Sequence, residues 1–260
     1  MALKLNRWRQ LLLSGLCAGL ASHALAASFN VNPIGFALGS ERSSGVLQIT
    51  NTGDEAVRIQ VNAVDWSTDG RQEVLADTDA LLLNPPIFAI APGKTQFLRF
   101  GLRHPMDSNT EKSYRLLIDE VPPGGPPAPG LTTLLRVSIP VFIAPLKKQE
   151  KISWQIKRET KGLVLVAAND GNVHAKIVRI VLSNSDKNSD KNNDRNNSSS
   201  NDSKDNLQIS TPAYVLPGQR KEWPLANGKI RAGAVRLQIL TDKGEIEEHL
   251  MLETDQISSR

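Results

Sequence analysis

The stretch that decides the fold is residues 131–143, LTTLLRVSIPVFI. Successive side chains of an extended strand point to opposite faces. One face therefore carries Leu131, Thr133, Leu135, Val137, Ile139, Val141 and Ile143. The other face carries Arg136, Ser138 and Pro140. Proline has no amide hydrogen to donate, so Pro140 predicts that this strand lies at a sheet edge. A long apolar edge invites another chain to pair with it, and we expect this edge to be shared with a partner.

Short strands separated by turns continue on both sides of this stretch, without a helical period. Strands are predicted over residues 29–38, 46–51, 57–66, 95–102 and 113–121 before it, and over residues 151–158, 163–168, 173–182, 235–240 and 245–252 after it. Within the strand 57–66 the apolar side chains change face after Ala63, which predicts a β-bulge there. The spacing of the strands predicts an all-β chain of immunoglobulin-like β-sandwiches.

The two sets of strands meet at Pro145-Leu146-Lys147-Lys148, which predicts a domain boundary near residue 147. Residues 27–146 would form the first domain and residues 147–260 the second. Residues 122–130, PPGGPPAPG, predict a loop because proline and glycine disfavour a strand ladder. Residues 183–206 contain no apolar side chain and predict a disordered loop. That segment lacks the spaced glycine and closing glutamate of a calcium loop, so we expect no calcium there.

The N-terminal residues 1–26 predict a secretory signal peptide. A basic start with Lys4, Arg7 and Arg9 precedes an apolar run, and Ala24-Leu25-Ala26 has the small residues of a cleavage site. Removing this segment lowers the formal charge from +4 to +1, which disfavours a nucleic-acid partner. It also removes the only cysteine, Cys17, so the mature chain would have no disulfide or thiol chemistry. No further apolar run is long enough to span a membrane.

Signatures of catalysis are absent from the sequence. It contains no Gly-x-Ser-x-Gly, no His-Glu-x-x-His and no dinucleotide-binding pattern. We therefore expect no catalytic residue, no cofactor and no metal. His104, His174 and His249 are far apart and are expected to be ordinary surface or hairpin residues.

Tryptophan and arginine side chains on the predicted strands have two possible roles each. Trp66, Trp154 and Trp223 are expected to pack in or near the core rather than to stack on a ligand. Arg99 and Arg115 alternate with apolar neighbours. Each could bind a carboxylate through both of its terminal nitrogens, or could be a solvated cross-strand partner of an acidic residue such as Glu111 or Asp119.

Several short motifs, in order, resemble one known family. In the first domain these are Asn32-Pro33, Asn51, Trp66, Asn84-Pro85-Pro86-Ile87-Phe88, Ala91-Pro92-Gly93-Lys94 and the segments 113–122 and 136–142; in the second they are Asn169-Asp170-Gly171-Asn172 and Leu216-Pro217-Gly218. The chain resembles the periplasmic chaperones of chaperone/usher pilus assembly, most of all their archaic or alternative branch. The resemblance implies two immunoglobulin-like domains set at an angle, as in a boomerang, and a non-enzymatic protein of the periplasm.

The resemblance also implies a mechanism and its partners. A pilus subunit is an immunoglobulin-like domain without its last strand, and the chaperone lends it an edge strand before delivery to an outer-membrane usher. Here the lent side chains would be Leu131, Thr133, Leu135, Val137 and Ile139. Whether the free chaperone covers this edge by self-association is left open. The rival hypotheses are a pilin-like or other structural immunoglobulin-fold protein, and a secreted hydrolase with two converging carboxylates.

Two departures from the family concern its anchor for the subunit's C-terminal carboxylate. The better-known branch uses an Arg shortly after the first-strand Pro and a Lys in the last strand of the first domain. Here the first position reads Pro33-Ile34-Gly35 and the second falls on Pro140. Arg99 and Arg115 are the predicted replacements, with Arg136 as a third candidate. The family's Arg before the proline that ends this strand is Ala144, so any ion pair between the domains must be built differently.

Overall fold

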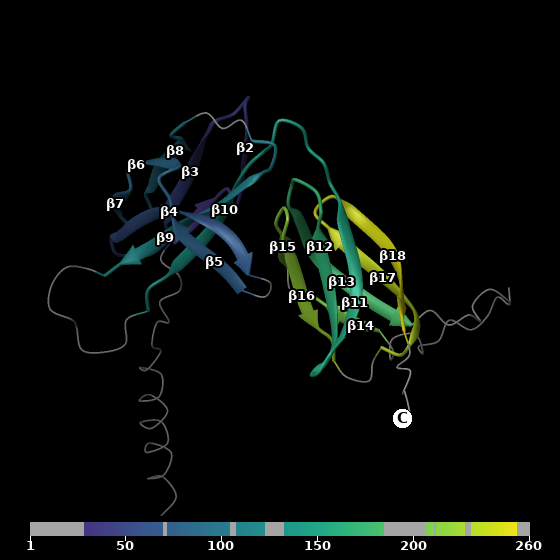
Figure 1. The fold of residues 1–260 in the computed structure, drawn as a ribbon. Helices are drawn as coiled ribbons and strands as arrows, with labels where there is room; N and C mark the ends of the chain where they lie inside the picture. The colour runs from purple at the N-terminus through teal and green to yellow at the C-terminus, as the bar shows by residue number, and fades with distance from the viewer. Residues whose placement is uncertain are drawn as a thin grey trace, which may run out of the picture.

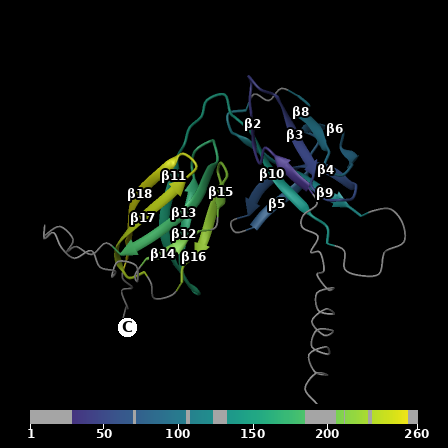
Figure 2. The same cartoon turned by 180° about the vertical axis from the view of Figure 1, so that it is seen from behind.

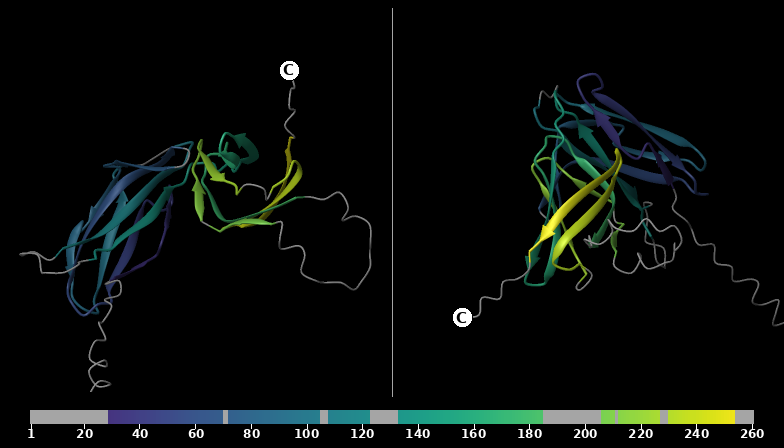
Figure 3. Two further views of the ribbon diagram at one scale, coloured as in Figure 1. Left: turned by 90° about the horizontal axis from the view of Figure 1, so that it is seen from below. Right: turned by 90° about the vertical axis from the view of Figure 1, so that its right-hand side faces the viewer.

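Two β-sandwiches set at an angle make up the part of the chain that the computed structural model describes (Figure 1). The described residues are 29–69, 72–104, 108–122, 133–184, 206–210, 212–226 and 230–253. Strands built from residues 29–143 form the first sandwich and strands built from residues 152–252 form the second. The views at right angles in Figure 3 show that the sandwiches meet at one end and diverge from there. The predicted fold class is confirmed.

The first sandwich packs a four-stranded sheet against a six-stranded sheet. The smaller sheet has the order β1 (Phe29–Asn32), β3 (Ser44–Asn51), β8 (Thr95–Leu102), β6 (Leu81–Asn84). The larger has the order β2 (Phe36–Leu38), β10 (Arg136–Ile143), β9 (Lys112–Val121), β4 (Val57–Asp69), β5 (Gln72–Asp77), with β7 (Ile87–Ile90) also beside β4. Leu47 and Leu98 from one sheet and Ile59, Leu116 and Ile139 from the other form its buried core.

Two predictions about this sandwich are wrong. The strand predicted over 29–38 is two strands, since β1 pairs with β3 and β2 pairs with β10 of the opposite sheet. There is no bulge near Ala63, because β4 keeps one continuous register with β9 from Arg58 to Asp65. Its apolar side chains change face because Val64 and Trp66 are buried on the outer face of the sheet, whereas Asp65 on the inner face is exposed. Trp66 packs against residues of the second sandwich rather than into the first core.

The second sandwich consists of a three-stranded sheet and a five-stranded sheet (Figure 2). One sheet has the order β11 (Ile152–Glu159), β12 (Gly162–Asn169), β16 (Arg220–Pro224). The other has the order β14 (Leu207–Ile209), β13 (Ala175–Asn184), β17 (Gly233–Thr241), β18 (Gly244–Leu252), with β15 (Ala213–Val215) also beside β13. The predicted loop 183–206 begins too early, because β13 continues to Asn184. Residues 185–205 and 123–130, which carry most of the two predicted loops, lie outside the described residues, as does the predicted signal peptide.

A buried asparagine ties one end of the first sandwich together. The Asn51 amide donates to the carbonyl oxygens of Glu55 (2.7 Å) and Ile90 (2.8 Å). Its own side-chain oxygen accepts from the amide of Gly53 at 2.9 Å. All the polar atoms of this side chain are therefore used inside the fold, although the residue is fully buried.

The second sandwich repeats this arrangement. The Asn169 amide donates to the carbonyls of Val173 and Val215, both at 2.8 Å, and its oxygen accepts from Gly171 at 2.9 Å. In each sandwich the backbone carbonyl of this asparagine also accepts from the backbone amide of the glycine in a Pro-Gly turn. The donor is Gly93 at 3.1 Å for Asn51 and Gly218 at 2.9 Å for Asn169. Both of these glycines have positive φ, 67° and 70°, which a residue with a side chain rarely adopts. The two domains thus share one local device as well as one fold class.

Candidate partner-binding edge and cleft

The candidate site is built on β10, which is paired on only one side along most of its length. β9 pairs with it from Arg136 to Ile143, whereas β2 covers its other side only from Val141 to Ile143. Within the described part of the chain, residues 136–140 thus have an open edge. The edge position predicted from Pro140 is correct for these residues and wrong for the last three, where β2 completes the sheet.

The backbone of β10 shows which groups face this open side. Leu135 accepts from the Glu120 amide at 2.9 Å, and Ala144 donates to Leu38 of the β2 strand at 2.8 Å. The N–H and C=O groups of successive residues point to opposite sides of a strand. The backbone groups of the even-numbered residues of β10 therefore point away from β9. The open edge therefore presents the amides and carbonyls of Arg136 and Ser138. Pro140 has no amide hydrogen to leave unpaired there.

The inward side chains of β10 pass from the core to its margin. Ile139 is only 1% exposed and belongs to the core of this sandwich. Val137 and Leu135 are half-buried and pack against that core from its edge. Thr133 is exposed, and Leu131 lies outside the described residues. Of the five side chains predicted to enter a partner, Ile139 already belongs to the core of the protein's own first sandwich, and Leu135 and Val137 are the apolar ones at the margin of that core.

The three arginine candidates lie in different places. Arg99 is exposed on β8, on the outer face of the four-stranded sheet. Arg115 on β9 and Arg136 on β10 belong to the six-stranded sheet and share its outer face. That face also carries Trp66 and Phe142, which pack against Leu216 of the second sandwich. Arg115 and Arg136 therefore lie on the face of the first sandwich that contacts the second sandwich, and Arg99 does not.

Arg115 is the most enclosed of the three. Its guanidinium carbon lies 3.8 Å from the centre of the Trp66 ring, and one terminal nitrogen donates to the Ser138 hydroxyl at 3.2 Å. The other terminal nitrogen pairs with Glu73 at 2.5 Å. In register, Arg115 lies directly opposite Pro140, where the family resemblance places a lysine. Among the described residues, Arg115 Nε and the Trp66 indole nitrogen are buried donors without a hydrogen-bond partner.

Arg136 is engaged differently. Its Nε and one terminal nitrogen donate to the two carboxylate oxygens of Asp119. The hydrogen bond to Asp119 and the charge of that carboxylate raise the pKa of Arg136. The sequence suggested a cross-strand pair with Asp119 as an alternative role for Arg99 or Arg115. In the structure Arg136 makes this pair. With both carboxylate oxygens bound, Arg136 is less suited than Arg115 to receive a partner's carboxylate.

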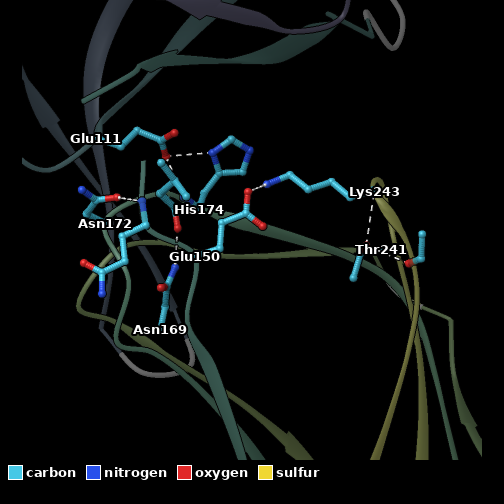
Figure 4. A network of polar contacts seen from close by, with 10 residues as sticks. Glu111, Glu150, Asn169, Asn172, His174, Thr241 and Lys243 are labelled. Carbon is cyan, nitrogen blue, oxygen red and sulfur yellow. Dashed lines mark hydrogen bonds and ion pairs between the residues drawn. The ribbon is translucent and has the colours of Figure 1, made fainter. Parts of the chain in front are cut away.

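The connection between the sandwiches is fixed by residues for which the sequence predicted no such role (Figure 4). The Glu111 carboxylate, from the first sandwich, lies 2.8 Å from His174 Nδ1 and accepts from the His174 backbone amide at 2.9 Å. The imidazole ring stacks on Phe142 of β10, with ring centres 3.6 Å apart. His174 is therefore a junction residue and not the ordinary surface residue that we predicted. Glu111 and His174 thus join the two sandwiches at a polar contact that does not involve Ala144.

A single asparagine side chain holds the linker itself. The Asn172 amide donates to the carbonyls of Asn109 (2.7 Å) and Lys147 (2.8 Å), and its oxygen accepts from the Gln149 amide at 2.6 Å. Asn172 belongs to the Asn169-Asp170-Gly171-Asn172 motif noted in the sequence. Its bonds join both sandwiches and the linker, so the relative position of the sandwiches is specified by polar contacts.

An aromatic cluster lies at the contact between the two sandwiches. Trp66 and Phe142 of the first sandwich pack against Tyr214 and Leu216 of the second, with ring centres 5.2 Å apart for Trp66 and Tyr214 and 5.5 Å apart for Phe142 and Tyr214. Trp66 and Trp223 are buried and Trp154 is half-buried, in line with the packing role predicted for all three.

The ionisation of Tyr114 should lower the stability of the first sandwich at alkaline pH. Burial, and secondarily the charge of Asp65, raise the pKa of Tyr114 to about 12. The phenol of the unfolded chain, with its lower pKa, loses its proton first as the pH rises. The stabilisation from neutral Tyr114 is therefore complete below pH 10 and is lost as the pH approaches 12. Denaturant titrations between these pH values should show a steeper loss of stability in the wild type than in Tyr114→Phe, with Tyr214→Phe, the only other tyrosine, as control. Parallel curves for wild type and Tyr114→Phe would contradict this.

The described residues contain no group of three or more side chains placed to hold a metal ion. No helix among them is long and apolar enough to cross a membrane.

Comparison with known proteins identifies the family of the first sandwich. The family described as "Pili and flagellar-assembly chaperone, PapD N-terminal domain" matches residues 28–149, the segment that contains every strand of the first sandwich. The first sandwich belongs to the PapD-like pilus-assembly chaperone family. The expected resemblance is thereby confirmed at the level of the family.

Solved structures of pilus chaperones share the fold over both sandwiches. The CsuC–CsuE chaperone–tip adhesion subunit complex from archaic Csu pili of Acinetobacter baumannii has a TM-score of 0.62 at 17% identity, covering 88% of this chain and 100% of that chain. The YadV chaperone has a TM-score of 0.60 at 16% identity, with 87% and 100% covered. The Salmonella enterica SafA pilin–SafB chaperone complex has a TM-score of 0.58 at 16% identity, with 87% and 97% covered. No curated protein matches the sequence.

Proposed function

We propose that this pilus-assembly chaperone binds fimbrial subunits by lending them the open edge of β10 and then delivers them to an outer-membrane usher. The observation that carries the proposal is the unpaired backbone of residues 136–140 beside half-buried apolar side chains. An extended partner strand can pair with such an edge through main-chain hydrogen bonds while alternate side chains give specificity. Work in the periplasm, after export through the predicted signal peptide, follows from the same assignment.

The free energy of subunit binding comes chiefly from further burial of the Leu135 and Val137 side chains. Each is only half-buried in the free protein, so each can gain further burial inside a subunit. Full burial of an aliphatic side chain is worth about 1.5 to 3 kcal/mol, and part of that is already realised at the core margin. The gain is large enough to hold an incomplete subunit, and a subunit's own strand with better packing can replace it without a nucleotide or another cofactor.

Arg115 is the residue that we propose to bind the subunit's C-terminal carboxylate. Its position opposite Pro140, its stacking on Trp66 and its free Nε support this role over Arg99 and Arg136. An arginine held by stacking and packing is already oriented, so less side-chain entropy is lost when a carboxylate binds.

Co-expression with the pilin-like proteins of neighbouring genes tests the function. The chaperone, purified from the periplasm through a tag, should bring with it one small β-rich subunit in equal amount. Recovery of free monomer or self-associated protein only, with the pilins degraded or aggregated, would refute subunit capture and favour the pilin-like structural alternative.

Replacing Arg115 by alanine should reduce the recovered subunit about tenfold or more, since a charge-assisted bidentate bond contributes on the order of 1.5 to 3 kcal/mol. Arg99→Ala is the matched control, because it removes the same side chain from the exposed outer face of the other sheet. Equal recovery with Arg115→Ala and wild type would remove Arg115 from this role, and a loss confined to Arg99→Ala would assign the role to Arg99.

A further inference from the structure

Arg115 already binds a carboxylate in the free protein. A terminal nitrogen of Arg115 lies 2.5 Å from Glu73 Oε1. The two partners are held very differently, because the Arg115 side chain is 12% exposed and the Glu73 side chain is 49% exposed. The arginine is thus fixed by its surroundings, and the glutamate reaches it from the solvent side.

The strand that carries Glu73 can release this contact without disturbing the core. β5 is an edge strand that pairs only with β4, and all six of its residues are exposed. A change of the Glu73 side-chain rotamer would place its carboxylate in water. Arg115 would keep its stacking on Trp66 and its bond to Ser138.

The present pairing leaves part of the arginine unused. The guanidinium group has five N–H donors in a planar fork. Nε–H and one terminal N–H point in the same direction from one edge of this planar group. The described residues give Arg115 Nε no partner, and Glu73 binds through one carboxylate oxygen. A ligand carboxylate that reached both Nε and a terminal nitrogen would make a bidentate bond, which is stronger than a single contact. The unpartnered indole N–H of Trp66 offers a further donor nearby.

We infer that Glu73 is an exchangeable internal carboxylate, which occupies Arg115 in the free chaperone and is displaced by the C-terminal carboxylate of a bound partner. The inference rests on the proposed role of Arg115 in subunit binding. One carboxylate replaces another, so the half-enclosed arginine is never left without a counter-charge. The exchange also makes the site selective, because a ligand must supply a better placed carboxylate together with contacts along β10.

Competition for a limiting subunit tests the exchange. Wild type and Glu73→Gln, carrying different tags, are expressed in the same cells with one pilin-like subunit. Glu73→Gln should take about three to ten times more subunit than the wild type, because the binding-competent fraction of its Arg115 is larger. Asp77→Asn is the matched control, because it removes the same charge from the same face of β5, and no contact joins Asp77 to Arg115 among the described residues. In an Arg115→Ala background the advantage of Glu73→Gln should disappear.

A second measurement on the free protein needs no subunit. Sodium acetate is titrated against sodium chloride at equal ionic strength while the Trp66 indole N–H resonance is followed. Glu73→Gln should respond at three- to tenfold lower acetate concentration than the wild type. Equal responses, or a competition ratio of one, would overturn the role of Glu73. If neither protein captures a subunit but the acetate responses differ, the proposed function fails while the exchange at Arg115 stands.

Discussion

Leu135→Asp should abolish subunit capture while leaving the chaperone folded. Leu135 lies at the margin of its own core, so an aspartate there can turn toward water in the free protein. In the proposed complex the same side chain must enter a subunit, where an unpaired charge costs several kcal/mol. Recovery of co-expressed subunit should fall about a hundredfold or more, and the thermal midpoint of the free chaperone should change by only a few degrees.

The neighbouring residue provides the control for this experiment. Leu134 is 43% exposed, whereas the adjacent Leu135 is half-buried against the core. Leu134→Asp introduces the same charge one residue away and should leave capture close to that of the wild type. If both variants fail to capture, charge near the strand rather than burial in a subunit controls binding. If Leu135→Asp still yields soluble complexes, the proposed register is wrong.

Asn51→Ala should produce the largest loss of stability in the first sandwich. The substitution leaves the Ile90 and Glu55 carbonyls and the Gly53 amide without their present partners, and the site is fully buried. Each buried polar group left unpaired costs about 1 to 3 kcal/mol. We expect the free energy of unfolding of this domain to fall by about 2 to 4 kcal/mol in urea titrations followed by circular dichroism.

Asn62→Ala, at an exposed position of β4, should change the free energy of unfolding by less than about 0.5 kcal/mol. Asn169→Ala should weaken the second sandwich as Asn51→Ala weakens the first, because its hydrogen bonds are equivalent. A small effect at Asn51 and Asn169 would mean that water or neighbouring groups replace these bonds readily.

The alternation of apolar side chains predicted the strands and the open edge correctly where one face is buried and one is not. It misled at Val64 and Trp66, because a sequence cannot distinguish a local bulge from a strand whose second face is covered by another domain. It also missed β5, whose six residues are all exposed and therefore leave no burial pattern in the sequence.

The candidate site could be predicted only in part for a related reason. Alternation correctly put Arg99 and Arg115 on faces away from the core, but it gave no information on which sheet each strand joins. Arg99 and Arg115 therefore seemed equivalent, although only Arg115 lies on the face of the first sandwich that contacts the second. Glu111 and His174 are 63 residues apart and belong to different sandwiches, so no spacing signal connects them. The buried asparagine of the Asn169–Asn172 motif was visible in the sequence, but its role as the counterpart of Asn51 required the hydrogen bonds.

The polar junction around Asn172, Glu111 and His174 bears on the kinetics of loading. Because these contacts specify the angle between the sandwiches before any partner arrives, loading needs no hinge closure. Association then spends little conformational entropy on the chaperone itself. Its rate should depend on encounter and on the unfinished state of the subunit rather than on a slow domain motion. Under the proposed function, the protein would act as a rigid template and the subunit would undergo the conformational search.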